Sequence, residues 1–350
     1  MRKIVIQISV MVFIAGCLSP IDRFAGYIGN QIVISGQIST LTESSAVYVG
    51  RTSSIERLPE PVLDATVIMS DDQGNSYSFI QDFETPGKYI LADVPGKSGT
   101  SYRLHVSLAD GRQYVSATEK LPPAPGTDEV YYSIESDEYI DGDGIIAQRD
   151  FVKIYTNHTL PETSEPVFMK WHVEEVYVLS PTDFPDPFAN VPPSCYIAQQ
   201  VDPQRIVLFN NEENKAPSIS GLLVVSRLID PTFKERHYFT TYQTRLTKEA
   251  YEYWRKVDVV ANQTGSIFDA PPARVRGNIT SVENSAEEVH GYFQAVNQSF
   301  HRFFLLPDDL PYGMPIHCEY RPEREYFDYP SECLNCRTVR NSSYNRPSWF

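Results

Sequence analysis

The first third of the chain consists of short segments in which apolar and polar residues alternate. Such segments run from about residue 31 to 121, as in QIVISGQI and VLDATVIM, and turns such as SDDQGN and ADGR separate them. Alternation with a period of two predicts strands with one buried face, and turn residues at this spacing are typical of antiparallel sheets. We therefore expect a β-sandwich of about seven strands over 31–121.

The order of these strands is similar to that of immunoglobulin-like modules. DATVIMSDDQG is followed by GKYILADV and then by GTSYRLHVSLADGRQYVS, which fits a last pair of strands joined by a hairpin. The Pro-rich segment PPAPGTDEV at 122–130 comes next and predicts a joint between two domains.

Residues 128–350 predict a larger β-rich domain that carries one prominent helix. Runs such as RDFVKIYTNHTL, EPVFMKWHVEEVYVL and VHGYFQAVNQSFHRFFLL are typical of strands. Near 247–262, Thr247 is a plausible N-cap and Gly265 a plausible end of a helix. In that stretch apolar residues recur at helical spacing: Leu246, Ala250, Trp254, Val257 and Ala261. The expected fold class is therefore mainly β.

The first 16 residues have the pattern of a signal peptide. Arg2 and Lys3 precede an apolar stretch that is too short to span a bilayer. The stretch ends in Ile-Ala-Gly-Cys17, which matches the bacterial lipobox, in which the cysteine is lipidated and becomes the mature N-terminus. We therefore expect cleavage after residue 16, lipidation (palmitate) at Cys17, and a tether over 17–30. A plain signal peptide with a chance cysteine is the alternative.

The composition narrows the set of partners. The chain has 30 basic and 45 acidic residues, a net charge of −15, which does not suit nucleic acid or anionic lipid surfaces. A hydrophobic content of 41% is enough for packed cores. Beyond the leader, no stretch is long and apolar enough to cross a membrane, so we expect the rest of the chain to be soluble and attached to the membrane through its N-terminal lipid.

The sequence presents no familiar catalytic motif. None of the seven histidines has HExxH spacing, and neither GxSxG nor a P-loop occurs. In WHVEE (171–175), His172 and Glu174 share one face of a strand, and we expect a surface or packing role. Trp171, Trp254 and Trp349 are expected in the core. We predict no catalytic residue, no metal site and no cofactor.

The segment YIDGDGIIAQRD (139–150) shares part of the pattern of a calcium loop. Asp141, Asp143, Gly144 and Asp150 fall at ligand or turn positions. However, the first position is Tyr139, and the last is an aspartate in place of the bidentate glutamate. An Asp-Gly hairpin explains the segment with fewer assumptions, and calcium binding stays open.

Four cysteines remain after Cys17, namely Cys195, Cys318, Cys333 and Cys336. The last two form a CxxC, which serves zinc binding, redox catalysis or a disulfide in different proteins. An oxidising compartment outside the cytoplasm favours two disulfides. Zinc knuckles come as two paired motifs, and a redox CxxC needs a helix and a βαβ unit, neither of which is indicated here. Two of the three pairings join Cys195 to the CxxC, and the sequence does not choose among them.

The run TKEAYEYWRKVDVVANQTGSIFDAPPARVRGNITSVENSAEEVHGYFQAVNQS resembles the signature of the domain-of-unknown-function family 4249, lipoproteins of Bacteroidetes-type bacteria. In that family an AYxFW helix precedes GSxFDxxP, GNIxSxxNxxExVxGYFxAS and a terminal CxxC…KPxFW. The order of the last two aromatics is reversed here, and Arg340-Asn341 replaces the family's Gly-Gly. The matching positions are Ala250, Tyr251, Trp254, 265–269, 277–279, Asn284, 291–293, Cys333, Cys336 and 346–350.

The resemblance implies an outer-membrane lipoprotein, often associated with a TonB-dependent receptor, and it offers no catalytic residues to carry over. We therefore expect a non-catalytic binding or accessory subunit in nutrient uptake. Its anchor would be lipid, its partner such a receptor, and its body would face the periplasm or the cell surface. The alternatives are an extracytoplasmic hydrolase whose site is assembled from distant residues, and a structural or adhesive envelope protein.

Overall fold

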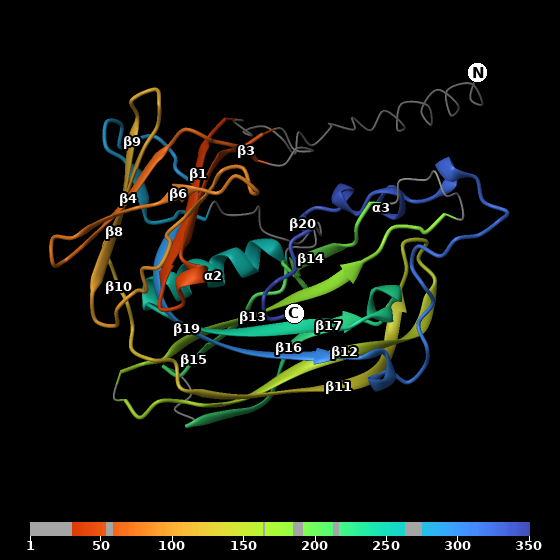
Figure 1. Cartoon of the computed structure of the whole chain (residues 1–350). Coiled ribbons are helices and arrows are strands. Elements are labelled where there is room, and N and C mark those ends of the chain that lie inside the picture. Colours follow the sequence, from red (N-terminus) through yellow and green to blue (C-terminus); the bar gives the residue numbers. More distant parts are fainter. Residues whose placement is uncertain (1–29, 54–58, 164, 185–191, 213–216, 263–274) are drawn as a thin grey trace, which may run out of the picture.

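The computed structural model describes residues 30–53, 59–163, 165–184, 192–212, 217–262 and 275–350. Over these residues the chain is mainly β, as predicted, with three sheets and a few short helices (Figure 1). The predicted signal peptide, the lipidation site Cys17 and residues 17–29 of the tether lie outside the described residues.

The largest sheet joins strands from both halves of the chain. Within the described residues it has 11 strands, of which nine form a continuous order and two pair at its side. In that order they are β20 (Ser342–Ser343), β14 (Cys195–Gln200), β13 (Phe168–Leu179), β17 (His237–Leu246), β19 (Phe293–Leu305), β1 (Ile32–Ser39), β2 (Ala46–Arg51), β7 (Lys88–Ile90) and β6 (Ile80–Gln81). β15 (Val207–Asn210) pairs with β13, and β3 (Glu60–Pro61) pairs with β2.

Two smaller sheets pack against this one. The first has the order β18 (Ile279–Ser281), β9 (Gln113–Ser116), β8 (Ser101–Ser107), β4 (Thr66–Asp71) and β5 (Ser76–Ser78), with β10 (Glu119–Lys120) on β8. The second consists of β11 (Thr127–Ile140), β12 (Ile146–Thr159) and β16 (Ser218–Leu228). Figure 1 shows β4, β8 and β9 on the left and the long strands β11, β12 and β16 at the bottom.

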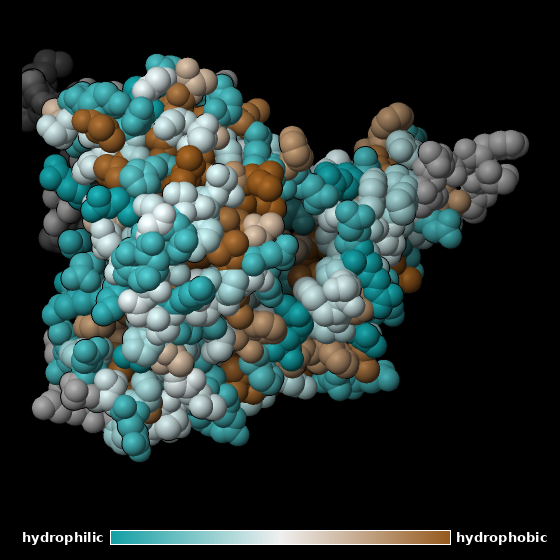
Figure 2. Space-filling view, turned by 60° about the vertical axis from the view of Figure 1, so that its left-hand side comes forward, coloured by the Kyte–Doolittle hydropathy of each residue, from teal (hydrophilic) through white to brown (hydrophobic). Residues whose placement is uncertain are grey.

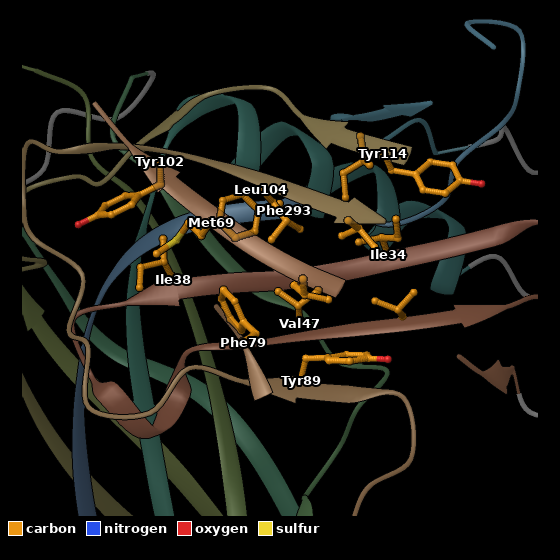
Figure 3. Packing of buried hydrophobic residues seen from close by; sticks show 14 of the residues in the cluster. Ile34, Ile38, Val47, Met69, Phe79, Tyr89, Tyr102, Leu104, Tyr114 and Phe293 are labelled. Atoms are coloured by element: carbon orange, nitrogen blue, oxygen red, sulfur yellow. The ribbon is translucent and has the colours of Figure 1, made fainter. Parts of the chain in front are cut away.

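The N-terminal sandwich has a dry core between two sheets. Ile34, Ile38 and Val47 from the large sheet meet Met69 and Leu104 from the smaller one (Figure 3). Their alternation along β1, β4 and β8 is the period-two pattern seen in the sequence, because every second side chain points into the core. Tyr89, Tyr102 and Tyr114 close the edges of this cluster.

Residues from the second half complete this sandwich. β1 pairs in parallel with β19, so that Gly36 lies opposite Phe293 and Ser39 opposite Val296. β18 pairs antiparallel with β9. The predicted range 31–121 therefore omits strands that share its core, and the two predicted domains are joined by one continuous sheet. Parallel neighbours far apart in the chain leave no local signal, which is why the sequence did not indicate this pairing.

The predicted helix is present as α2 (Lys248–Ala261). As expected, the side chain of Thr247 caps it by accepting a hydrogen bond from the Ala250 amide. Ala250 is buried and Ala261 is exposed, so the predicted apolar face is buried only over its first turns. The expected end at Gly265 lies outside the described residues. The only other α-helix among the described residues is the single turn α3 (Ser331–Leu334). 3₁₀ turns occupy Thr42–Ser44, Pro231–Lys234, Pro307–Asp309, Tyr326–Asp328 and Cys336–Thr338.

The segment 139–150 is a hairpin between β11 and β12. The Asp141 carboxylate accepts hydrogen bonds from the amides of Asp143 and Ile145, and Gly144 has a φ of 80°. Asp150 lies within β12 opposite Ser136, four residue pairs from the end of the ladder. At about 3.4 Å per residue this separates Asp150 from the turn by more than 10 Å, so the segment does not form a calcium loop.

Within the described residues, no helix has the length and apolar character needed to cross a bilayer. On the face shown in Figure 2, hydrophobic residues lie in patches separated by hydrophilic ones, and the outline is indented between two masses of the molecule.

A cationic cleft between the two halves

A cavity among the described residues lies where the N-terminal strands meet the long strands. Its volume is about 470 Å³, within the usual range for small-molecule sites. One wall comes from β1, β2 and β7, the other from β13 and the segment before β15, and α2 reaches across one end. The lining side chains that matter below are Gln37, Tyr48, Lys88, Lys170, His172, Gln200, Arg205, Trp254, Tyr292 and Gln294.

The alternation of β13 brings Lys170 and His172 to this cleft. Met169, Trp171 and Val173 point to the opposite face and are buried in the core beneath the three-stranded sheet. Lys170 and His172, with the opposite parity, therefore face the cleft. Trp171 confirms the prediction that it belongs to the core, where its indole N–H donates to Asp128 at 2.9 Å.

The ammonium of Lys170 lies on the face of the Trp254 ring. The distance from Nζ to the ring centroid is 3.7 Å, which is cation–π geometry. No carboxylate of the described residues pairs with this ammonium, and burial lowers the pKa of Lys170 to about 8. The lysine is thus still mostly protonated at neutral pH, inside a cleft whose described lining contains no aspartate or glutamate.

A chain of amide side chains fixes the Trp254 ring. Its Nε1 donates to Gln294 Oε1 at 2.8 Å, and Gln294 Nε2 donates to Gln37 Oε1 at 2.8 Å. Gln37 Nε2 continues to Gln298 Oε1 at 3.2 Å, and Gln298 Nε2 reaches Thr244 Oγ1 at 3.0 Å. Trp254 is therefore not a core residue as predicted but an oriented wall of the cleft, since its polar edge is held and its face meets Lys170.

His172 is a neutral member of the cleft. Its ring stacks on Tyr242 with centroids 4.8 Å apart. Burial, together with the positive charge of Lys170, lowers the pKa of His172 to about 3. The predicted packing role is compatible with this stacking. The imidazole does not contribute charge near neutral pH.

Two further cations reach the rim. Lys88 Nζ lies 3.7 Å from Asp82, and its side chain is 40% exposed. Arg205 donates from Nε to the Val224 carbonyl and from Nη2 to the Leu223 carbonyl, both at 2.9 Å. The guanidinium of Arg205 is thus held on β16, outside the cleft lining, while Lys88 and Arg205 both belong to the residues that line the cleft.

A buried joint next to the cleft holds α2 against the sheets. Glu119 on β10 accepts hydrogen bonds from the Tyr292 hydroxyl at 2.5 Å, the Thr247 hydroxyl at 2.9 Å and the Asn278 amide at 3.1 Å. Burial raises the pKa of this carboxyl. Asn278 also pairs with the backbone N–H and C=O of Phe293, as a neighbouring strand would.

Glycine is required where this joint is tightest. A Cβ on Gly277 would lie 1.6 Å from the Gly291 carbonyl oxygen, and one on Gly291 would lie 2.0 Å from the Ile34 carbonyl oxygen. Gly291 also has a φ of 95°, which side chains rarely tolerate. The GNI and GYF segments noted in the sequence are thus the close contacts of this joint.

The family described as Domain of unknown function (DUF4249) matches residues 21–302, which is most of the chain. This protein belongs to the DUF4249 family. No curated protein matches the sequence. The match covers both sandwich and cleft and ends before the cysteine-rich tail.

The four body cysteines of this DUF4249 protein form two disulfides, as predicted. Cys195 on β14 bonds Cys336, and Cys318 bonds Cys333. The CxxC is therefore split between two bridges, and its second cysteine ties the tail to the large sheet. Both bridges lie in one buried cluster with Tyr177, Leu179, Ile197 and Tyr329.

The disulfides also decide the metal question at the CxxC. Ligand atoms of His317, Cys318 and Cys333 lie within 4.8 Å of one another. Since the two sulfurs are bonded to each other, they are not the thiolates that zinc requires.

The C-terminal aromatic residues lie beyond the bridges. Phe350 packs on Tyr196 and Tyr238. Trp349 is 38% exposed and lies under the Arg302 guanidinium, so it is not in the core as predicted.

Sequence reasoning placed His172 and Trp254 in packing roles, but it did not predict the cleft of this DUF4249 chain and missed Lys170, Gln37 and Gln294. Lys170 offered one signal, because it stands directly between the apolar residues Met169 and Trp171. Gln37 and Gln294 had no such signal, since they come from strands that meet only in the folded sheet. Cys17 lies outside the described residues, so its lipidation stays a prediction.

Proposed function

We propose that this DUF4249 chain is a lipid-anchored, non-catalytic binding protein of the outer membrane, working as an accessory to a TonB-dependent receptor in nutrient uptake. The observation that carries the binding part is the cleft of about 470 Å³, in which Lys170 and Trp254 are held in place by neighbouring side chains. Concave sites with a few fixed polar groups are the usual form of a ligand site.

The lining supports binding over hydrolysis. A hydrolase needs a base or nucleophile poised near the working pH and a group that orients it. His172 is the histidine of the described lining, and its pKa of about 3 makes it a poor base at neutral pH. No carboxylate or thiol of the described lining stands beside it.

The anchor and the receptor rest on other grounds. The basic start, apolar stretch and Cys17 support a lipidated N-terminus. The receptor partnership rests on what the family resemblance described above implies; the family match itself supports membership alone.

The partnership is tested by affinity purification from the native envelope. The tag belongs in the exposed hairpin turn at 141–145, because the C-terminal aromatics pack on the large sheet. After detergent extraction, mass spectrometry is expected to find a TonB-dependent receptor with the wild type. A Cys17→Ser variant, which cannot take the lipid, should lose it. Recovery of no such receptor, or equal recovery with an unrelated lipoprotein carrying the same tag, contradicts the proposal.

A further inference from the structure

The charge of the cleft is opposite to that of the protein. The chain carries a net charge of −15, yet the described lining of the cleft includes Lys88, Lys170 and Arg205 and no acidic residue. A local field of this sign attracts anions even when the whole molecule is acidic. The charged residues of the described lining are thus all basic, whereas the chain as a whole is acidic.

Lys170 is the cation of this set that lacks a polar protein partner among the described residues. Lys88 has Asp82, and Arg205 has two backbone carbonyls. Lys170 has the Trp254 ring face, which attracts a cation but does not neutralise it. A partly desolvated ammonium is costly unless a counter-charge accompanies it. That counter-charge is available from a ligand in the cleft.

The rest of the lining fits a polar organic body more than a bare ion. Gln200 and the second amide N–H of Gln294 offer polar groups, and Tyr48 and Trp254 offer aromatic surface. Amide and aromatic side chains together bind molecules with hydroxyl groups and apolar faces. The volume is far larger than an inorganic oxyanion needs and accommodates a molecule of drug or sugar size.

We propose that the cleft binds a small organic anion, whose carboxylate or phosphate group pairs with Lys170 and whose body contacts the aromatic and amide lining. This inference rests on the proposed binding function and adds to it the class of ligand.

The test compares probes of one shape and different charge. Isothermal titration calorimetry with glucuronate and glucose 6-phosphate, each against glucose, separates the carboxylate, the phosphate and the uncharged body. We expect at least one of the two anions to bind and glucose to bind at least about tenfold more weakly. The Lys170→Met variant should weaken binding of that anion roughly 30-fold or more, because the ion pair is partly desolvated.

The matched control is Lys256→Met, which removes an exposed lysine from the same helix that carries Trp254. It should leave anion binding unchanged, so that a general loss of positive charge is distinguished from the loss of Lys170. A circular dichroism spectrum that matches wild type shows that each variant is folded.

Two results overturn the inference. One is no binding by either anion up to about 10 mM, far above the range of useful affinities. The other is equal affinity for glucose and the anions, unchanged in Lys170→Met; this leaves the binding function standing and removes the charge selectivity. Failure of the receptor purification, by contrast, has no bearing on these titrations.

Discussion

Replacing Lys170 with methionine is expected to make the folded protein more stable, although it removes the proposed ligand contact. Methionine has a similar length and no charge, so it fills the space beside Trp254 without a buried ammonium. A residue that costs stability and faces a cleft is better explained by function than by folding.

The magnitude follows from the pKa. Burial lowers the pKa of Lys170 from 10.5 to about 8, and each unit corresponds to about 1.4 kcal/mol. The charged form therefore costs about 3 kcal/mol in the folded state, an upper value because the side chain is only partly buried. The substitution also removes the cation–π contact, which stabilises the wild type by about 0.5–2 kcal/mol and therefore offsets part of the gain. At neutral pH we therefore expect the free energy of unfolding of Lys170→Met to exceed that of wild type by about 1–2 kcal/mol.

The pH dependence gives an independent check of the sign. Between the folded pKa and the unfolded pKa, the unfolded chain binds a proton on Lys170 that the folded chain does not, so wild-type stability rises with pH. The variant lacks this contribution. The excess in the variant's free energy of unfolding should be complete near pH 7 and largely lost near about pH 10.

Urea unfolding of both proteins, followed by tryptophan fluorescence across this pH range, measures the difference. Other titrating groups are common to both chains and cancel in the comparison. Lys256→Met, on an exposed site, should stay within about 0.5 kcal/mol of wild type at each pH. The reasoning is refuted if Lys170→Met is less stable than wild type at pH 7, or if its difference does not change with pH.

Four further substitutions test the rest of the structure by denaturant unfolding. Cys195→Ser opens a bridge spanning 141 residues and should cost about 5 kcal/mol, against about 3 kcal/mol for Cys318→Ser, whose bridge spans 15; equal losses would contradict this order. Glu175→Gln removes a buried carboxylate bound by a histidine and an arginine and should cost about 3–5 kcal/mol at neutral pH. Since the pKa of Glu175 is lowered to about 2, wild type should lose that advantage as the pH falls from about 4.5 toward 2, and a pH-independent difference would count against it. Glu119 has a raised pKa, so wild type should lose stability relative to Glu119→Gln as the pH rises above about 4.5, and the opposite slope would exclude a desolvated carboxyl there.

The sequence predicted what depends on near neighbours along the chain. The strands of the N-terminal sandwich, α2 with its Thr247 cap, and the hairpin at 139–150 were readable because periodicity, caps and turns are local. The parallel pairing of β1 with β19 was not, since it joins segments separated by most of the chain. The compartment predicted disulfides, but only the packing of β14 against the tail selects the partner of Cys195.

The cleft is also assembled from distant parts of the chain, and residues of the family signature help to position its lining. The glycines at 277 and 291, Asn278 and Tyr292 close the joint at Glu119 beside the N-terminus of α2, and Tyr292 also lines the cleft. Because this joint fixes where α2 begins, it also fixes where Trp254, two turns later, meets Lys170 and Gln294. These joint residues thus act on the cleft through position, whereas Trp254, which also belongs to the signature, contacts Lys170 directly. A change in the joint should therefore alter the orientation of Trp254 before it alters the charge of the cleft.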